Sequence, residues 1–247
     1  MWEIKTFNKV FNLLIVVSAL VMALIRFAFK SCSVQTRELV IYVLSLFNIL
    51  FFFFYYKRNM SKDAEYLQVT GREKFNWWNE LPLQLCNINM FVIPLGVLLD
   101  NEFLKGFGFF VAPLGAMLAL LMPEKTFRGY SLWMPRILGF YGTHILIVIC
   151  GISLVTLGLY VPNVDNIVGI LSVTVMLMTL MHIVNTILRK TVCSYANYFY
   201  TYDTVGVKAL EWLREKFRYP LVYLFPVVLI LIPYMYVITL IHNLFAN

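Results

Sequence analysis

The feature of this sequence that most limits its fold is a series of apolar blocks with few charges, each long enough to cross a membrane as a helix. An α-helix rises about 1.5 Å per residue, so about 20 residues span the ~30 Å hydrocarbon core of a bilayer. The blocks are apolar throughout, whereas the strands of a membrane β-barrel would alternate. Seven blocks can be identified, at about 10–29, 39–56, 81–99, 103–121, 137–160, 167–188 and 221–244. The sequence therefore predicts an all-α polytopic membrane protein with about seven transmembrane helices.

Composition points to the same class. Of the 247 residues, 61% are hydrophobic and only 13% are charged. A water-soluble domain of this length could not cover that apolar surface with polar side chains. No domain linker or repeat stands out, so we expect a single transmembrane domain over residues 1–247, with cytoplasmic loops at about 57–80 and 189–220. Within the second loop, apolar residues at helical spacing over 207–217 predict an amphipathic surface helix that connects two spans.

Basic residues are distributed unevenly between the connecting segments. With seven spans these segments alternate between the two sides of the membrane, and sixteen of the 20 Lys and Arg residues then fall on the side of the amino terminus. The positive-inside rule places that side in the cytoplasm, so we expect a cytoplasmic N-terminus, an external C-terminus and a location in the plasma membrane. The net charge of +7 needs no nucleic-acid partner, because basic loops beside a membrane attract anionic lipid headgroups.

Polar side chains inside the predicted spans are the candidates for function. All thirteen carboxylates lie outside the spans or at their rims, which disfavours an ion-coupled pump, because such pumps rely on intramembrane Asp or Glu. Helical rise places Cys86 about 8 Å, His182 about 9 Å, His144 about 10 Å and Asn48 about 12 Å inside the cytoplasmic ends of their spans. Four different helices thus bring a polar group to one layer. The polar residues within the spans are Asn48, Gln84, Cys86, Asn87, Asn89, Tyr141, Thr143, His144, His182 and Asn185.

A thiol and two imidazoles at one depth suggest nucleophilic chemistry, because a thiolate nucleophile needs a neighbouring base. Cys86 is the candidate nucleophile and His144 the candidate base. The candidates for binding or orienting a substrate are Gln84, Asn87, Asn48, Tyr141, His182 and Asn185. A simpler interpretation is available for each of these residues, since polar side chains often bond between membrane helices, at a gain of about 0.6–2 kcal/mol, and Cys can serve as a small apolar residue.

Sequence patterns of disulfide, metal-binding, phosphate-binding and other hydrolytic sites are absent. Cys32, Cys150 and Cys193 show neither a disulfide pattern nor zinc-ligand spacing relative to one another. Glycine-rich phosphate loops, GxSxG and HExxH are absent. We therefore expect no metal ion and no cofactor.

Three short motifs resemble the YwaF-like integral membrane protein family. In chain order they are Leu81-Pro82-Leu83-Gln84-Leu85-Cys86, Phe140-Tyr141-Gly142-Thr143-His144, and Asn185 followed by Asn197-Tyr198-Phe199-Tyr200. Their order and helical setting agree with that family over about residues 40–205. The animal branch of the family includes an acyltransferase that moves polyunsaturated acyl chains onto ether phospholipids, and an intramembrane Cys and His are implicated in its activity. By motif position the resemblance implies these roles for Cys86 and His144.

Two functions stay open at this level. The first is an intramembrane lipid acyltransferase or acyl hydrolase, in which a Cys–His dyad in the cytoplasmic leaflet forms an acyl-enzyme and passes the acyl group to a lysophospholipid or to water. The second is a non-catalytic membrane protein that binds or transports a lipid or small solute, with Pro82, Pro94 and Pro113 interrupting helices around the site. Both predict membrane lipids, above all phospholipids, as partners.

Overall fold

The computed structural model describes residues 2–246, which are helical apart from loops and one isolated β-bridge between Glu3 and Ser131. The α-helices are α1 (Lys9–Phe29), α2 (Val34–Leu50), α3 (Arg58–Met60), α4 (Ala64–Thr70), α5 (Asn89–Leu98), α6 (Glu102–Leu121), α7 (Pro135–Thr156), α8 (Ile167–Thr191), α9 (Lys208–Lys216) and α10 (Phe225–Ala246). A π-helix, η1 (Phe51–Lys57), joins α2 to α3. Five short 3₁₀ turns are η2 (Trp77–Asn79), η3 (Lys125–Phe127), η4 (Val164–Asn166), η5 (Tyr198–Tyr200) and η6 (Val222–Leu224).

Six helical stretches of the described chain are long and apolar enough to cross a membrane, so the protein is a multi-pass membrane protein. They are Lys9–Phe29, Val34–Met60, Glu102–Leu121, Pro135–Thr156, Val164–Thr191 and Val222–Phe245. In the most apolar 18-residue stretch of α7, 72% of the residues are buried within the protein, whereas in that of α1 only 11% are buried. The apolar side chains of α1 therefore face outward, where lipid is their solvent, and α7 is the central helix.

The third predicted span differs from a regular helix. Helix α5 covers only ten residues, Asn89–Leu98, and the eight residues from Leu81 to Ile88 form bends and turns. The prediction of a continuous helix from Leu81 is therefore wrong. Pro82 has no N–H, and the N–H of Leu81 donates to the hydroxyl of Tyr198 at 3.1 Å instead of to a helical carbonyl. Irregular backbone is tolerated at membrane depth where the protein itself supplies such partners.

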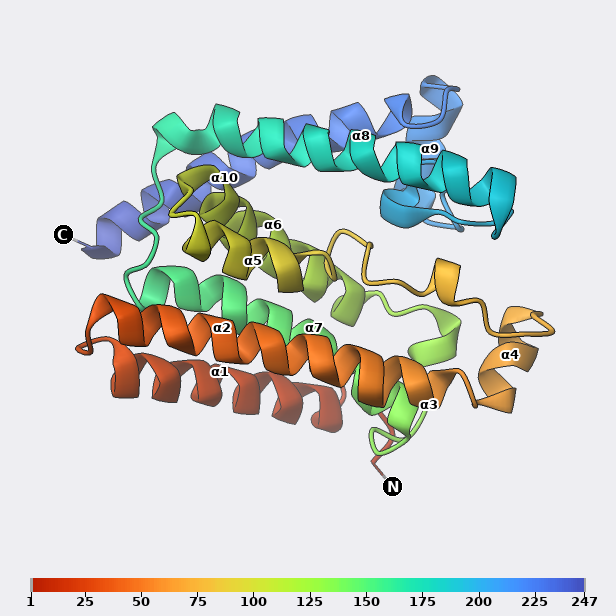
Figure 1. Cartoon of the computed structure of the whole chain (residues 1–247), viewed down its shortest axis with the longest axis horizontal. Helices are drawn as coiled ribbons and strands as arrows, with labels where there is room; N and C mark the ends of the chain where they lie inside the picture. Colours follow the sequence, from red (N-terminus) through yellow and green to blue (C-terminus); the bar gives the residue numbers. More distant parts are fainter. Residues whose placement is uncertain (1, 247) are drawn as a thin grey trace.

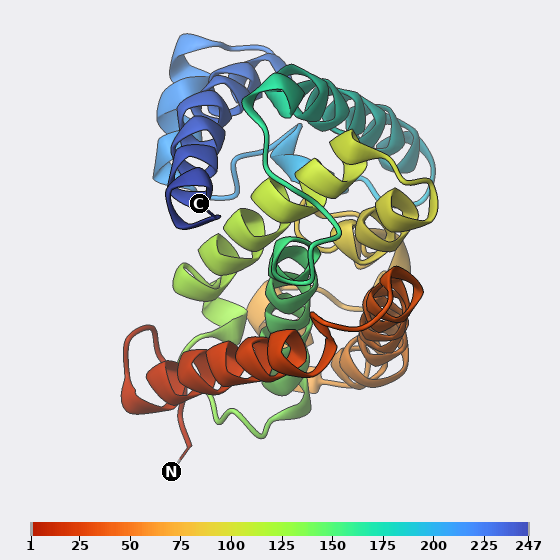
Figure 2. The same cartoon turned by 90° about the vertical axis from the view of Figure 1, so that its left-hand side faces the viewer.

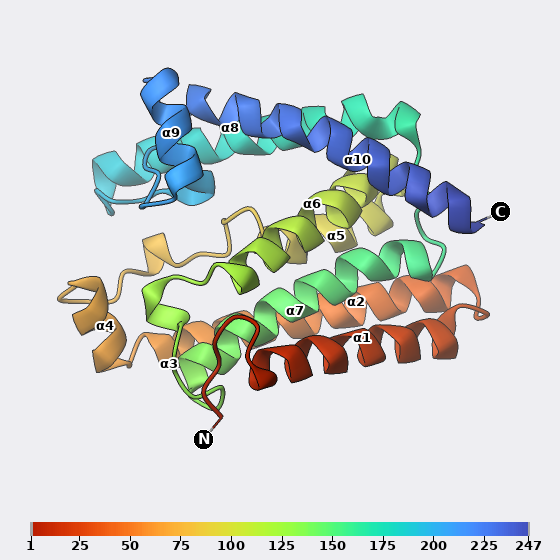
Figure 3. The same ribbon diagram turned by 180° about the vertical axis from the view of Figure 1, so that it is seen from behind.

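The helices form three layers. In Figure 1, α8, α9 and α10 lie on one side, α1 and α2 lie on the other, and α5, α6 and α7 lie between them. The view from behind in Figure 3 has the same arrangement, and the end view in Figure 2 places α7, in green, at the centre. The first described residues lie toward the α3 end and the last toward the opposite end. The chain ends Met1 and Asn247 lie outside the described residues, and the membrane side of each end stays a prediction.

The π-helix packs against a glycine face of α7. A Cβ added to Gly139 would lie 2.4 Å from the ring of Tyr56, and one added to Gly142 would lie 3.0 Å from the ring of Phe51. Only glycine permits this approach of aromatic rings to the α7 backbone. π-helical turns are rare and occur often at functional sites. Here the turn ends at Lys57, whose side chain is buried.

The polar segments between the spans are themselves structured. The surface helix predicted at 207–217 is present as α9, with Leu213 buried and Trp212 exposed. Helix α4, within the predicted loop 57–80, is tied to the start of α7 because buried Arg136 pairs with Asp63 at 2.7 Å and with Glu65 at 3.3 Å.

Candidate cysteine–histidine site

Cys86 and His144 are in contact although they are 58 positions apart in the sequence. Cys86 lies in the irregular stretch before α5, and His144 lies in the cytoplasmic half predicted for α7. The Sγ atom of Cys86 is 3.3 Å from Nε2 of His144. His144 is buried and Cys86 is partly exposed. A partly exposed thiol therefore lies within hydrogen-bonding distance of a buried ring nitrogen.

The second ring nitrogen of His144 determines which nitrogen can act as a base. Nδ1 of His144 lies 2.7 Å from the carbonyl oxygen of Phe140, one helical turn earlier. A carbonyl oxygen only accepts hydrogen bonds, so Nδ1 must carry the ring proton. In the neutral imidazole Nε2 then presents its lone pair to the Cys86 thiol. The α7 backbone therefore sets the tautomer that general-base chemistry requires.

Helices α6 and α7 and a loop aromatic enclose the pair. A Cβ added to Gly115 of α6 would lie 3.9 Å from backbone and Cβ atoms of Cys86, so α6 borders the thiol segment directly. The ring of Phe140 lies 4.5 Å from the His144 ring and stacks on Phe127 at 4.3 Å. These contacts restrict the imidazole to one orientation.

Two backbone N–H groups lie beside the thiol and donate to no backbone carbonyl in the described chain. Within the described chain, the backbone hydrogen bonds at the start of α5 use the N–H groups of Ile88 and Asn89, which donate to Gln84 and Cys86, but not those of Cys86 and Asn87. Cys86 and Asn87 both belong to the turn before α5, which begins at Asn89. Backbone N–H groups without a carbonyl partner beside a nucleophile are the kind of donor that can form an oxyanion hole.

Gln84 and Asn185 bind the turn that follows α8. Gln84 accepts a hydrogen bond from the N–H of Phe199 at 3.0 Å and donates to the carbonyl of Asn197 at 3.4 Å. Asn185 accepts from the N–H of Tyr198 at 2.8 Å and donates to its carbonyl at 2.8 Å. Both amides are therefore engaged by the turn after α8. Within the described residues, neither amide makes a hydrogen bond to His144, whose Nδ1 is bound by the Phe140 carbonyl, and a role of Asn185 toward an acyl acceptor stays a prediction.

The same turn holds the segment that carries Cys86. Tyr198 donates through its hydroxyl to the carbonyl of Trp78 at 2.7 Å and accepts from the N–H of Leu81 at 3.1 Å. Phe199 and Tyr200 each have φ of 56°, a left-handed conformation that non-glycine residues seldom adopt. Their strained backbone persists because Asn185 and Gln84 bind it from both sides.

Three further predicted residues, Asn48, Asn87 and Tyr141, each have a buried polar atom without a hydrogen-bond partner in the described chain. Asn48 donates to the carbonyl of Thr143 at 3.4 Å, next to His144. The Tyr141 hydroxyl and Oδ1 of both Asn48 and Asn87 are buried without a hydrogen-bond partner in the described chain. Buried polar atoms of this kind are candidate contacts for a bound molecule.

His182 lies apart from the pair. Its ring stacks on Tyr202 at 4.7 Å, and it makes no hydrogen bond to Cys86 or His144 within the described residues. The expectation of one cavity shared by Cys86, His144 and His182 therefore has no support at His182. Depth along the membrane placed the two histidines at one level, but they lie on different helices facing different neighbours.

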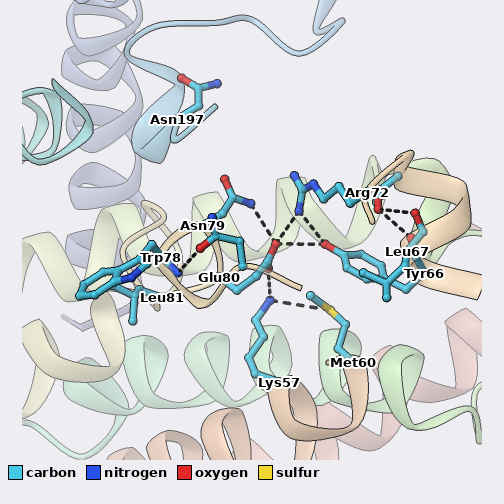
Figure 4. A network of polar contacts seen from close by, with 12 residues as sticks. Lys57, Met60, Tyr66, Leu67, Arg72, Trp78, Asn79, Glu80, Leu81 and Asn197 are labelled. Carbon is cyan, nitrogen blue, oxygen red and sulfur yellow. Dashed lines mark hydrogen bonds and ion pairs between the residues drawn. The ribbon is translucent and has the colours of Figure 1, made fainter. Parts of the chain in front are cut away.

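A buried ionic network close to Cys86 has no counterpart among the sequence predictions (Figure 4). Oε2 of Glu80 accepts from Lys57 at 2.7 Å. Oε1 accepts from the Tyr66 hydroxyl at 3.0 Å, from Arg72 at 3.0 Å and from Asn79 at 2.9 Å. Burial raises the pKa of Glu80, but the charge of Lys57 and these donors outweigh burial and hold the pKa below its ordinary value of 4.5. The sequence does not predict this pairing, because Lys57 and Glu80 are 23 positions apart.

The described residues form no candidate metal centre. Within residues 2–246, no group of three or more His, Cys, Asp or Glu side chains is placed to hold a metal ion. The four cysteines are free thiols, and two of them, Cys150 and Cys193, are buried away from the surface.

Comparison with known proteins identifies one family. The model of the TMEM164 family matches residues 4–239 of this chain. No curated protein and no solved structure matches it.

Proposed function

The chain belongs to the TMEM164 family, whose model matches nearly its whole length, and from the geometry of Cys86 and His144 we propose that it is an intramembrane cysteine-dependent lipid acyltransferase or acyl hydrolase. The observation that carries the proposal is the Nε2 lone pair of His144, held 3.3 Å from the Cys86 thiol by the hydrogen bond at Nδ1. A thiol activated by a base in hydrogen-bonding distance is the signature of nucleophilic catalysis.

In the first half of the proposed reaction, Nε2 of His144 takes the proton of the Cys86 thiol. The thiolate attacks the ester carbonyl carbon of a phospholipid, and the oxyanion accepts hydrogen bonds from the N–H groups of Cys86 and Asn87. The ester C–O bond breaks, the leaving alkoxide takes the proton from the imidazolium, and a lysophospholipid departs. The acyl group is then bound to Cys86 as a thioester.

In the second half, His144 removes the proton from the hydroxyl of an acceptor lysophospholipid or from water. The new oxygen nucleophile attacks the thioester, the C–S bond breaks, and the Cys86 thiolate regains its proton from His144. The acceptor decides whether the outcome is acyl transfer or hydrolysis.

Location and resemblance support a phospholipid substrate. The charge distribution predicts that the Cys86 end of the protein lies in the cytoplasmic leaflet of the plasma membrane, at the depth of phospholipid ester groups. The motifs around Cys86 and His144 resemble those of the YwaF-like family, whose animal branch includes an acyltransferase for ether phospholipids.

The test is an acyl-transfer assay with purified protein in nanodiscs that contain a phospholipid with one isotope-labelled acyl chain and an unlabelled lysophospholipid. We expect Cys86→Ala to abolish transfer and His144→Ala to reduce it about 10²- to 10⁴-fold, the usual contribution of a general base. Cys86→Ser should be nearly as inactive as Cys86→Ala, because a hydroxyl ionises less readily than a thiol. His242 lies near the C-terminal end of α10, far along the chain from the pair. His242→Ala is therefore the matched histidine control and should leave the rate unchanged.

The non-catalytic alternative predicts another pattern. If the site only binds a lipid, no variant changes acyl composition, and Cys86→Ser retains bound lipid as well as the natural protein, because a hydroxyl hydrogen-bonds better than a thiol. Acyl transfer that persists in folded Cys86→Ala protein would rule out the proposed mechanism.

A further inference from the structure

A wide groove lies beside the Cys86 segment. It has a volume of about 1120 Å³ and runs between residues 70–78 and the end of α8 with the segment that follows it. Arg189 in the last turn of α8, and Tyr195 and Asn197 after it, line this second wall. Asn76 donates to the carbonyl of Val192 at 3.2 Å, which ties the two walls together. Figure 4 shows Arg72 and Trp78 on one wall and Asn197 on the other. The groove is open to the surface at the end of the molecule that carries most of the basic residues.

Two arginines of the groove are held in place by aromatic rings. The Arg72 guanidinium lies 4.7 Å from the centre of the Tyr195 ring, and that of Arg189 lies 4.8 Å from the centre of the Tyr202 ring. Arg72 uses one terminal nitrogen for Tyr66 and Glu80, and Arg189 uses one for the carbonyl of Ala196.

Each of these arginines therefore keeps further N–H donors for a ligand. A guanidinium carries five N–H groups in a fixed plane that matches the oxygens of a phosphate. Because stacking has already restricted the two side chains, binding costs less conformational entropy than it would for free arginines. Arg72 and Arg189 are therefore suited to an anionic ligand.

The other lining residues narrow the choice of ligand. Lys74 is a third cation, while Glu73 and Asp203 are carboxylates, so the groove has an excess of one positive charge. That balance fits a ligand with a single negative charge and disfavours a polyphosphate, which would meet the two carboxylates.

The aromatic residues indicate at which level of the bilayer the groove lies. Trp77, Trp78 and Tyr195 line it and are 43%, 50% and 41% exposed. Trp and Tyr of membrane proteins concentrate at the headgroup level, where their rings have one apolar and one wet side. A phosphodiester at that level belongs to a phospholipid.

We propose that this groove binds the phosphate of a cytoplasmic-leaflet phospholipid, with Arg72, Lys74 and Arg189 as its cationic contacts. The acyl chains would leave the groove past the exposed tryptophan rings toward the bilayer. The site is separate from the Cys86 thiol, so the proposal holds whether or not Cys86 is a nucleophile. For the proposed reaction it would supply headgroup recognition.

Native mass spectrometry of the detergent-purified protein with added dioleoyl phosphatidylglycerol, whose phosphodiester carries a single negative charge, tests the proposal. Lys74→Gln/Arg189→Gln should reduce the fraction of lipid-bound protein about tenfold or more, because it removes two charged hydrogen-bond donors to the phosphate. Lys62→Gln/Lys190→Gln is the matched control, because it removes the same charge from exposed positions outside the groove. Lys74→Gln alone, at an exposed side chain, should reduce binding partially and preserves the fold.

Further measurements in the same experiment identify the ligand and distinguish this proposal from the catalytic one. Dioleoylglycerol, which lacks the phosphate, should bind no better to the natural protein than to the double variant. Inorganic phosphate at the concentration of the lipid should not displace it; displacement would show a soluble phosphate site instead. Cys86→Ala should keep full binding even if all acyl transfer is lost. Equal lipid retention by the double variant and its control would overturn the proposal.

Discussion

Glu80→Gln tests whether the buried ionic network supports the segment that carries Cys86. The substitution keeps the size of the side chain but removes its charge, and it turns an amide toward Lys57, whose ammonium lies 2.7 Å from Oε2. The side chains of Lys57 and Glu80 are only 7% and 10% exposed. Removal of one partner from a buried pair leaves an uncompensated charge and costs about 3–5 kcal/mol. At about 2–4 °C per kcal/mol for a chain of this size, the unfolding midpoint should fall by about 6–20 °C.

The assay is thermal unfolding of the purified protein in detergent, followed by circular dichroism. Glu65→Gln is the control, because Glu65 also pairs with a buried arginine, Arg136, but is itself 45% exposed. Arg136 keeps its closer partner Asp63 at 2.7 Å when Glu65 loses its charge, and a half-exposed carboxylate contributes only about 0–1 kcal/mol, so the control should shift the midpoint little. Lys57→Met combined with Glu80→Gln should recover part of the loss, since it removes the stranded charge. A shift for Glu80→Gln no larger than that for Glu65→Gln would refute this reasoning.

Acidification should reproduce the effect of the substitution. Because the pKa of Glu80 is lowered in the folded protein, its stabilising contribution is present above its ordinary value of 4.5 and is lost as the pH falls through the folded pKa. The natural protein should therefore lose more stability below about pH 4.5 than Glu80→Gln does. Parallel loss in both proteins would show that other carboxylates control the acid transition.

Two further predictions concern topology and packing. A reporter fused after Asn247 should be external and one inserted near Asp63 cytoplasmic; reports from one side would contradict the orientation drawn from the charge distribution. Gly139→Ala should destabilise the protein by about 1–3 kcal/mol, because the new Cβ would lie 2.4 Å from Tyr56, whereas Gly115→Ala meets its neighbours at an ordinary 3.9 Å. Equal unfolding midpoints for the two alanine variants would contradict the close packing of η1 on α7.

The membrane class, the six long apolar helices and α9 follow from the sequence alone. Each depends on a local property, namely the length of an apolar run or the spacing of apolar residues along one helix. Helical rise also places Cys86 and His144 at similar depths, because depth depends only on the number of residues from the rim. Residue types and helical rise therefore select Cys86 with two histidines, His144 and His182, and only the motif resemblance points to His144.

Direction around a helix axis is set by packing between helices, and only the tertiary structure decided it. Gly139 and Gly142 let η1 lie against α7, His144 turns toward Cys86, and His182 turns toward Tyr202 instead. The helix expected from Leu81 is replaced by an irregular segment because Tyr198, more than a hundred residues later, satisfies its backbone. Contacts between residues distant in sequence leave no trace in composition or periodicity, so the hydrogen bond between Cys86 and His144 and the network around Glu80 become visible only in the folded chain.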